Sequence, residues 1–138
     1  MQPSQTVRDA TLHFYDRLSA SDVAGFDEVV AFDAVLIIGT APGEWVTDRA
    51  SMRFGFETEG VRLESGGAAV AYEEGTMGWV ADQPTFYFPD GSAMSTRLTA
   101  VFRQETGRWV LVHMHVSVGV PDDEVLELQR RWGTTEGG

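Results

Sequence analysis

The feature that most constrains the fold is a succession of strand-like segments in the second half of the chain, joined by short turns. An aromatic-rich segment at 77–88 is followed by segments at 94–104 and 108–118, both with strand-like patterns. The turn at 89–92 contains Pro and Gly, which favour the backbone angles of a tight turn, and 105–107 is a second turn. Turns this short join antiparallel neighbours, so the pattern predicts an antiparallel sheet.

Helical patterns stand before and after these strands. Apolar residues recur at helical spacing over 6–18, 21–30 and 48–59, and each segment begins at a residue that caps helices well. A further helix is expected at 121–132, with acids at its start and arginines at its end. The predicted fold class is α+β: a cone-shaped half-barrel in which a strongly curved antiparallel sheet packs against three N-terminal helices, with a short C-terminal helix.

The 138 residues are interpreted as one domain, 1–138, with a core of its own. The apolar fraction of 43% is typical of globular domains and argues against disorder. Residues 133–138 are mostly small and polar, and we expect them to form a frayed tail. A strongly bent sheet under helices leaves a cavity at its open end, where ligands commonly bind.

The net charge of −11 and the absence of Cys exclude several classes of function. A strongly negative surface repels phosphates, so neither nucleic acid nor an anionic membrane is an expected partner. The sequence has no Cys for disulfides and no phosphate-binding or dinucleotide-binding motif, so we expect no cofactor. The N-terminus has neither a basic start nor an apolar run, and a cytoplasmic location is expected.

The most specific motif lies in the last two predicted strands. Gly107-Arg108-Trp109 is followed by the segment His113-Met114-His115-Val116-Ser117. This pattern resembles the end of the nuclear transport factor 2-like superfamily, in particular its SnoaL-like group and the association domain of calcium/calmodulin-dependent protein kinase II. The resemblance extends over nearly the whole chain and implies the cone-shaped fold and a homodimer. Members commonly dimerise through the outer face of the sheet, where we expect Trp109, His113, His115 and Ser117.

The two histidines of this strand are two residues apart, so they share one face of the sheet. His113 and His115 are either a metal-binding or acid–base pair, or a hydrogen-bonded pair at the dimer-facing surface. No third ligand of matching spacing accompanies them, so we favour the second interpretation and expect no metal site. On the opposite face, Met114 is expected to point toward the cavity.

The resemblance also allows residues of this chain to be compared with the catalytic and ligand-binding positions of superfamily members. Its ketosteroid isomerases use an Asp base on the first strand and a Tyr oxyanion donor on the first helix, and Ile38 and Phe14 occupy those positions here. Tyr15 is rotated from Phe14 by about 100° around a helix and is a poor substitute. That chemistry is therefore not expected. The kinase association domain lines its pocket with arginines, and the matching residues are Ala81, Ala100 and Val116. The cavity should therefore prefer neutral, apolar ligands.

Three carboxylates remain as candidates for catalysis: Glu44, Asp33 and Asp82. Glu44 and Trp45 are either a carboxylate and an aromatic wall at the cavity mouth, or a solvated Glu beside a Trp that plugs the core, which we favour. Asp33 precedes the first strand, where a surface or capping role is more common than that of a base. Asp82 lies on a predicted strand, and the sequence does not determine to which face of the sheet its side chain points.

Strand alternation and the resemblance select the side chains expected to line the cavity: Tyr15, Trp45, Met52, Phe56, Trp79, Phe102 and Met114. Three functions are compatible with this pattern. The favoured one is a homodimer that binds a small apolar organic molecule. The second is a cyclase, isomerase or hydratase for a hydrophobic polyketide-like or steroid-like substrate, and the third is a non-catalytic oligomerisation module.

Overall fold

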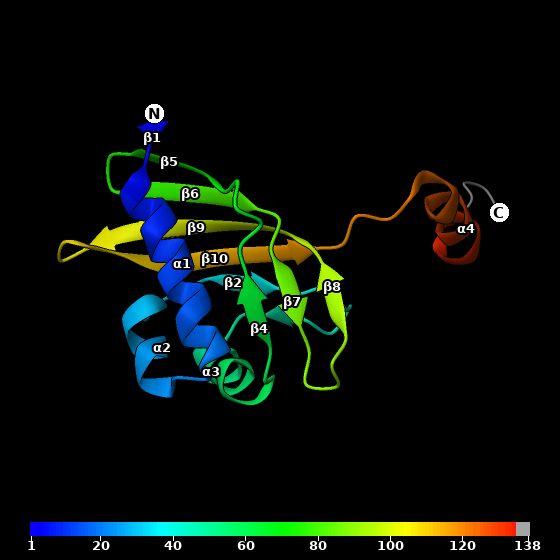
Figure 1. The fold of residues 1–138 in the computed structure, drawn as a ribbon, viewed down its shortest axis with the longest axis horizontal. Helices are drawn as coiled ribbons and strands as arrows, with labels where there is room; N and C mark the ends of the chain where they lie inside the picture. Colours follow the sequence, from blue (N-terminus) through cyan, green and yellow to red (C-terminus); the bar gives the residue numbers. More distant parts are fainter. Residues whose placement is uncertain (135–138) are drawn as a thin grey trace.

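The computed structural model describes residues 1–134 and shows helices packed against one side of a curved sheet (Figure 1). Of the expected frayed tail, Gly133 and Thr134 follow the last helix without regular structure, and 135–138 lie outside the described residues. The helices are α1 (Gln5–Ser19), α2 (Val23–Val29), α3 (Arg49–Thr58) and α4 (Asp122–Trp132). The first three helices and the final one are confirmed where the sequence patterns predicted them.

The first three helices begin at polar caps. Ser4, Asp22 and Asp48 each accept a hydrogen bond from the backbone N–H three residues further on, which satisfies a donor that the helix itself leaves free. The first helix therefore begins before Thr6, which the sequence pattern suggested as its start. The Thr6 hydroxyl instead accepts a hydrogen bond from the Trp109 indole N–H, at 2.9 Å.

Two sheets form the other layer. The larger sheet has the order β1-β5-β6-β9-β10-β2-β3 and the smaller the order β4-β7-β8. The pairing of β2 with β10 is parallel, whereas the other paired strands are antiparallel. The predicted antiparallel sheet is thus confirmed as a mostly antiparallel, mixed one. The strands are β1 (Gln2–Pro3), β2 (Leu36–Ile38), β3 (Trp45–Val46), β4 (Arg62–Glu64), β5 (Val70–Glu74), β6 (Met77–Asp82), β7 (Thr85–Tyr87), β8 (Ala93–Ser95), β9 (Arg97–Glu105) and β10 (Arg108–Ser117).

The long aromatic segment at 77–88 is two strands rather than one. It breaks at Pro84, which has no N–H to donate to a sheet, and the chain passes from the larger sheet to the smaller one. The Pro84 carbonyl accepts hydrogen bonds from the Thr96 backbone N–H at 3.1 Å and from the Thr96 hydroxyl at 2.8 Å. Beyond the break, the second strand pairs with β4 and β8, and Phe86 packs against the main core.

A β-bulge in β10 changes which residues share a face. Leu111 pairs with Phe102 and His113 pairs with Val101, which leaves Val112 as an extra residue. Leu111 therefore faces the main core with Met114, although simple alternation placed Leu111 with the histidines. Such a bulge interrupts the two-residue alternation of a strand.

The bulge also corrects the predicted position of Trp109. We expected Trp109 on the outer face with His113, but it packs against the main core under α1. A Cβ placed on Gly78 would lie 2.6 Å from the Val7 side chain and 3.4 Å from the Trp109 ring, so glycine lets helix and strand approach closely here. Trp109 is therefore removed from the predicted dimer surface.

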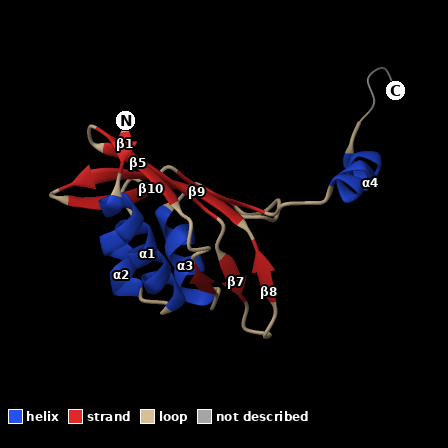
Figure 2. Cartoon of the chain, turned by 45° about the horizontal axis from the view of Figure 1, so that its top comes forward, coloured by secondary structure: helices blue, strands red, loops and turns tan. Residues whose placement is uncertain are grey.

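Figure 2 shows α1, α2 and α3 against one face of the larger sheet, and the core residues come from these helices and this face. Phe56 of α3 belongs to this core and makes edge-to-face contacts with Phe14 and Phe26, with ring centroids 6.1 and 5.3 Å apart. Such aromatic contacts add stability beyond the apolar area that they bury. The three helices are thus held to one another as well as to the sheet.

The last helix stands apart from this body at the end of an extended segment (Figures 1 and 2). It has acids in its first turn and arginines in its last turn, as expected, but none of its residues is buried. Trp132 at its end is 72% exposed. Among the described residues 1–134, no helix is long and apolar enough to span a membrane.

Candidate functional site

A cavity of about 320 Å³ lies between α1, α2 and α3 on one side and the strands on the other. Its walls are mostly apolar. Polar side chains border it from the loop that joins β2 to β3, from the two ends of α3, and from Thr96 between β8 and β9. The apolar lining residues are Phe14, Leu18, Phe26, Val30, Ile37, Ile38, Val46, Met52, Phe56, Val61, Phe86, Phe88, Met94, Met114 and Val116.

Three of the predicted lining residues are in this cavity. Met52 and Phe56 are four residues apart on α3, so they point from the same face of the helix. Met114 points inward from β10, after the bulge. That these side chains contact a ligand stays a prediction.

Four other predicted lining residues lie elsewhere. Tyr15 and Phe102 are buried in the core without bordering the cavity. Trp79 stacks on Tyr72 with ring centroids 5.3 Å apart, on the outer face of the sheet. Trp45 is 63% exposed, so it is neither a cavity wall nor a plug over the core. Because neighbouring strand residues point to opposite sides, Val46 lines the cavity in its place.

The positions matched to the ketosteroid isomerase residues both border the cavity. Phe14 comes from α1 and Ile38 from β2. Neither side chain can accept or donate a proton. Tyr15, the neighbouring residue on α1, points away from the cavity to Asp82.

The three carboxylates proposed for catalysis occupy different environments. Glu44 borders the cavity, whereas Asp33 and Asp82 do not. Asp33 accepts a hydrogen bond from Arg103 at 2.6 Å on the surface. This hydrogen bond lowers the pKa of Asp33, so it remains a charged surface residue.

Asp82 is held in a buried network with Tyr15. The Tyr15 hydroxyl donates to Asp82 Oδ2 at 3.0 Å, and Asp82 Oδ1 accepts the backbone N–H groups of Gln83 at 2.8 Å and Gly66 at 3.3 Å. Burial, and then the negative charge of Asp82, raise the pKa of Tyr15. The network joins α1 to the end of β6 and to the loop before β5, which is a structural role.

Glu44 is directed to the cavity by a tight loop. The Gly39 N–H donates to the Glu44 carbonyl at 2.8 Å, and the Glu44 N–H donates to the Ala41 carbonyl at 2.9 Å. The Glu44 carboxylate folds back over Gly39, where a Cβ would lie only 1.8 Å from Oε2. Glycine at position 39 thus provides the space that the carboxylate occupies.

A second carboxylate, Glu59, borders the same cavity and was not among the predicted site residues. It follows the last turn of α3, and Oε1 lies 3.9 Å from where a Cβ on Gly55 would be. Partial burial, and then the charge of Glu44, raise the pKa of Glu59. Helical spacing could have found it, because Glu59 follows Phe56 by three residues and Met52 by seven.

The predicted outer-face residues lie on the exterior of β10, except Trp109. His113 and His115 pair with Val101 and Thr99 of β9, and Ser117 pairs with Arg97. His113 Nδ1 lies 2.9 Å from the Leu36 carbonyl of β2, and His115 is exposed. Within residues 1–134 there is no group of three His, Cys, Asp or Glu side chains suited to a metal ion.

These features agree with the family of the chain. The SnoaL-like domain model matches residues 7–121, which is most of the chain. The protein therefore belongs to the SnoaL-like domain family. No curated protein matches the chain significantly.

Solved structures share the fold at low identity. A nuclear transport factor 2-like superfamily protein from Salmonella enterica is 14% identical, with a TM-score of 0.71, over 86% of this chain and 92% of that one. A putative calcium/calmodulin-dependent protein kinase type II association domain from Thiobacillus denitrificans is 21% identical, with a TM-score of 0.67, over 87% and 98%. An uncharacterised protein with a cystatin-like fold from Caulobacter vibrioides is 16% identical, with a TM-score of 0.68, over 91% and 96%. These similarities confirm the predicted fold class.

The network around Asp82 gives a testable stability effect. Tyr15→Phe removes one donor from a buried carboxylate, and we expect the free energy of unfolding at pH 7 to fall by about 1–3 kcal/mol. The matched control is Tyr87→Phe, whose half-buried ring makes a cation–π contact that Phe preserves, and which should change stability by less than about 0.5 kcal/mol. Urea unfolding followed by circular dichroism measures both.

The same pair predicts a dependence on alkaline pH. A tyrosine ionises near pH 10 in the unfolded chain, and in the folded chain Tyr15 keeps its proton to a higher pH. Its contribution to stability is complete below about pH 10 and is lost as the pH rises further. The advantage of the parent over Tyr15→Phe should therefore shrink above pH 10. Equal stability of the two proteins at pH 7 would contradict the network's role.

Proposed function

We propose that the protein is a homodimer whose cavity binds a small, mainly apolar organic molecule. The observation that carries this proposal is the cavity of about 320 Å³ with an apolar lining. Its volume is near the lower end of ligand-binding pockets, which range over roughly 300–1,000 Å³. A small organic compound of about one to three rings suits this space.

The cost of the cavity supports a role for it. Protein interiors are normally close-packed, and unfilled apolar space forfeits contacts and lowers stability. Here large side chains such as Phe14, Phe56 and Phe86 surround the space without filling it. A scaffold without a ligand would have no need to retain such a space, so the cavity argues against the purely oligomeric alternative.

The outer face of the sheet supports the homodimer. Val70 and Met77 on this face are 45% and 42% exposed, and the Tyr72–Trp79 stack lies beside them. Apolar side chains on an uncovered sheet face are a common feature of interaction surfaces. The surface also includes His115, which pairs with Thr99 in the middle of the sheet.

An enzyme of the cyclase, isomerase or hydratase type is the second candidate. One observation favours this candidate. Glu59 borders the apolar cavity together with Glu44, and its pKa is raised. A carboxylate with a raised pKa at a cavity can exchange protons with a substrate. Turnover of a bound compound that is lost in Glu59→Gln would establish this activity.

A cavity-filling variant tests ligand binding. Val46→Trp places a large side chain in the cavity, and we expect it to abolish the fluorescence increase of the neutral dye N-phenyl-1-naphthylamine that the parent should give. Val120→Trp is the matched control, because Val120 is exposed and outside the cavity. Thermal melting verifies that each variant is folded. Equal dye binding by a folded Val46→Trp protein, or none by the parent, would contradict the proposal.

A charge substitution tests the dimer surface. In a symmetric dimer His115→Glu places added negative charges near each other on a protein of net charge −11. We expect its dimer dissociation constant to rise by roughly tenfold or more. His13→Glu on the exposed side of α1 is the control and should leave the constant unchanged. Sedimentation velocity makes the comparison, and a monomeric parent would refute the homodimer.

A further inference from the structure

The exposed lining residues Glu44 and Glu59 define the mouth of the cavity, and this mouth has an unusual charge arrangement. Within residues 1–134, Glu44 and Glu59 are the charged residues that line the cavity, and no Arg or His of this range borders it. The remaining polar side chains of the lining are the hydroxyls of Thr40, Ser51 and Thr96. A ligand that enters the apolar space therefore meets two carboxylates and no cation.

Neither carboxylate is neutralised by the described part of the chain. Within residues 1–134, Glu44 and Glu59 make no side-chain hydrogen bond and no ion pair. They are also near enough for the charge of Glu44 to raise the pKa of Glu59. Two like charges beside an apolar wall repel each other more strongly than they would in water.

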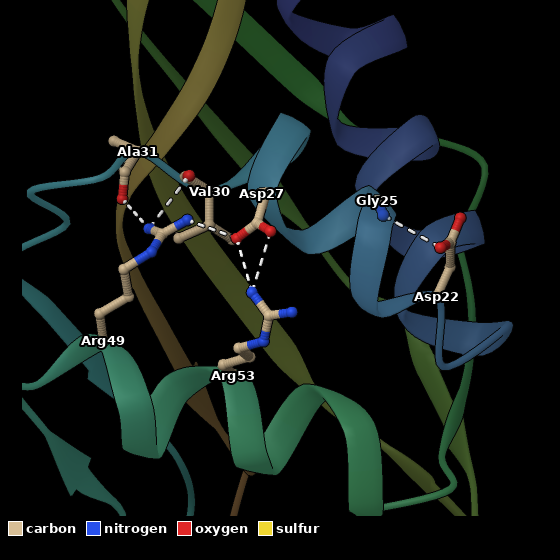
Figure 3. Close-up of polar contacts among 7 residues, drawn as sticks. All are labelled: Asp22, Gly25, Asp27, Val30, Ala31, Arg49 and Arg53. Atoms are coloured by element: carbon tan, nitrogen blue, oxygen red, sulfur yellow. Dashed lines mark hydrogen bonds and ion pairs between the residues drawn. The ribbon is translucent and has the colours of Figure 1, made fainter.

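The arginines of α3 are committed to a different face of that helix (Figure 3). Arg49 donates to Asp27 at 3.0 Å and to the Ala31 carbonyl at 2.6 Å, and Arg53 donates to Asp27 at 2.9 Å. These bonds hold α3 to α2 and to the segment that follows α2. They leave the cavity-facing side of α3 with Glu59 as its charged residue.

We infer that the cavity selects organic cations: small molecules with an apolar body and a protonated amine that lies between Glu44 and Glu59 at the mouth. This inference rests on the proposed ligand-binding function and narrows its ligand class. An ammonium group donates charge-assisted hydrogen bonds to both carboxylates and relieves their repulsion. A carboxylate ligand of the same shape adds a third negative charge and is rejected.

The position of Gly39 strengthens this assignment. The Glu44 side chain is exposed, but its carboxylate folds over Gly39 at the edge of the cavity. The tight loop from Gly39 to Glu44 therefore presents the carboxylate to the cavity. The ligand's apolar body would lie against Met52, Phe56 and Met114, below the charged mouth.

Three compounds of nearly identical shape test the selectivity: 1-naphthylmethylamine, 1-naphthalenemethanol and 1-naphthoic acid. At neutral pH they carry a positive, a neutral and a negative head on the same apolar body. Isothermal titration calorimetry at pH 7 and low salt should show that the amine binds roughly tenfold more tightly than the alcohol. The acid should bind more weakly than the alcohol.

A double variant assigns the preference to the mouth. Glu44→Gln with Glu59→Gln should reduce amine affinity to that of the alcohol and leave alcohol affinity unchanged. The control, Glu28→Gln with Glu57→Gln, removes the same net charge from exposed residues outside the cavity and should preserve the preference. An equal loss in both double variants would assign the effect to overall charge and overturn the inference.

The outcomes separate this inference from the proposed function. Equal binding of amine and alcohol by the parent overturns the cation preference but leaves an apolar ligand site. Tighter binding of the acid overturns it as well. Absence of binding by all three compounds, together with absence of binding by the neutral dye, refutes the ligand-binding function itself.

Discussion

The β-bulge at Val112 is the irregularity on which the inner face of the sheet depends. Before the bulge, Trp109 and Leu111 point to the helices, and after it Met114 points inward. Without the extra residue, strict alternation would continue from Leu111 and place His113 toward the cavity. The apolar floor of the cavity therefore requires one extra residue in β10, and the histidines are on the outer face for the same reason.

Helix α3 forms ion pairs on one face and lines the cavity with another. On one side, Arg49 and Arg53 bind Asp27 and fix the helix to α2. On another, Met52 and Phe56 supply apolar walls, and Glu59 follows at the same spacing. The helix is thus anchored by ion pairs outside the cavity, so its cavity-facing carboxylate is left for another partner.

Sequence patterns predicted the elements well and the cavity only in part. Helical periodicity located Met52 and Phe56, because helix spacing is regular and α3 has no break. Strand alternation misplaced Trp109, because a bulge depends on pairing with a neighbouring strand that a single segment does not show. The prediction that Trp79 points toward the cavity was wrong for a related reason, because the register of β6 is set by its pairing with β5 and β9.

The methyl groups of methionine offer the most direct test of the cavity as a ligand site. Met52, Met94 and Met114 border the cavity, whereas Met1 and Met77 do not. With ¹³C-labelled methionine methyl groups, NMR titration with the neutral dye N-phenyl-1-naphthylamine should shift the signals of the three cavity methionines. The signals of Met1 and Met77 should stay in place. Shifts confined to Met1 and Met77, or no shift at saturating dye, would contradict the account.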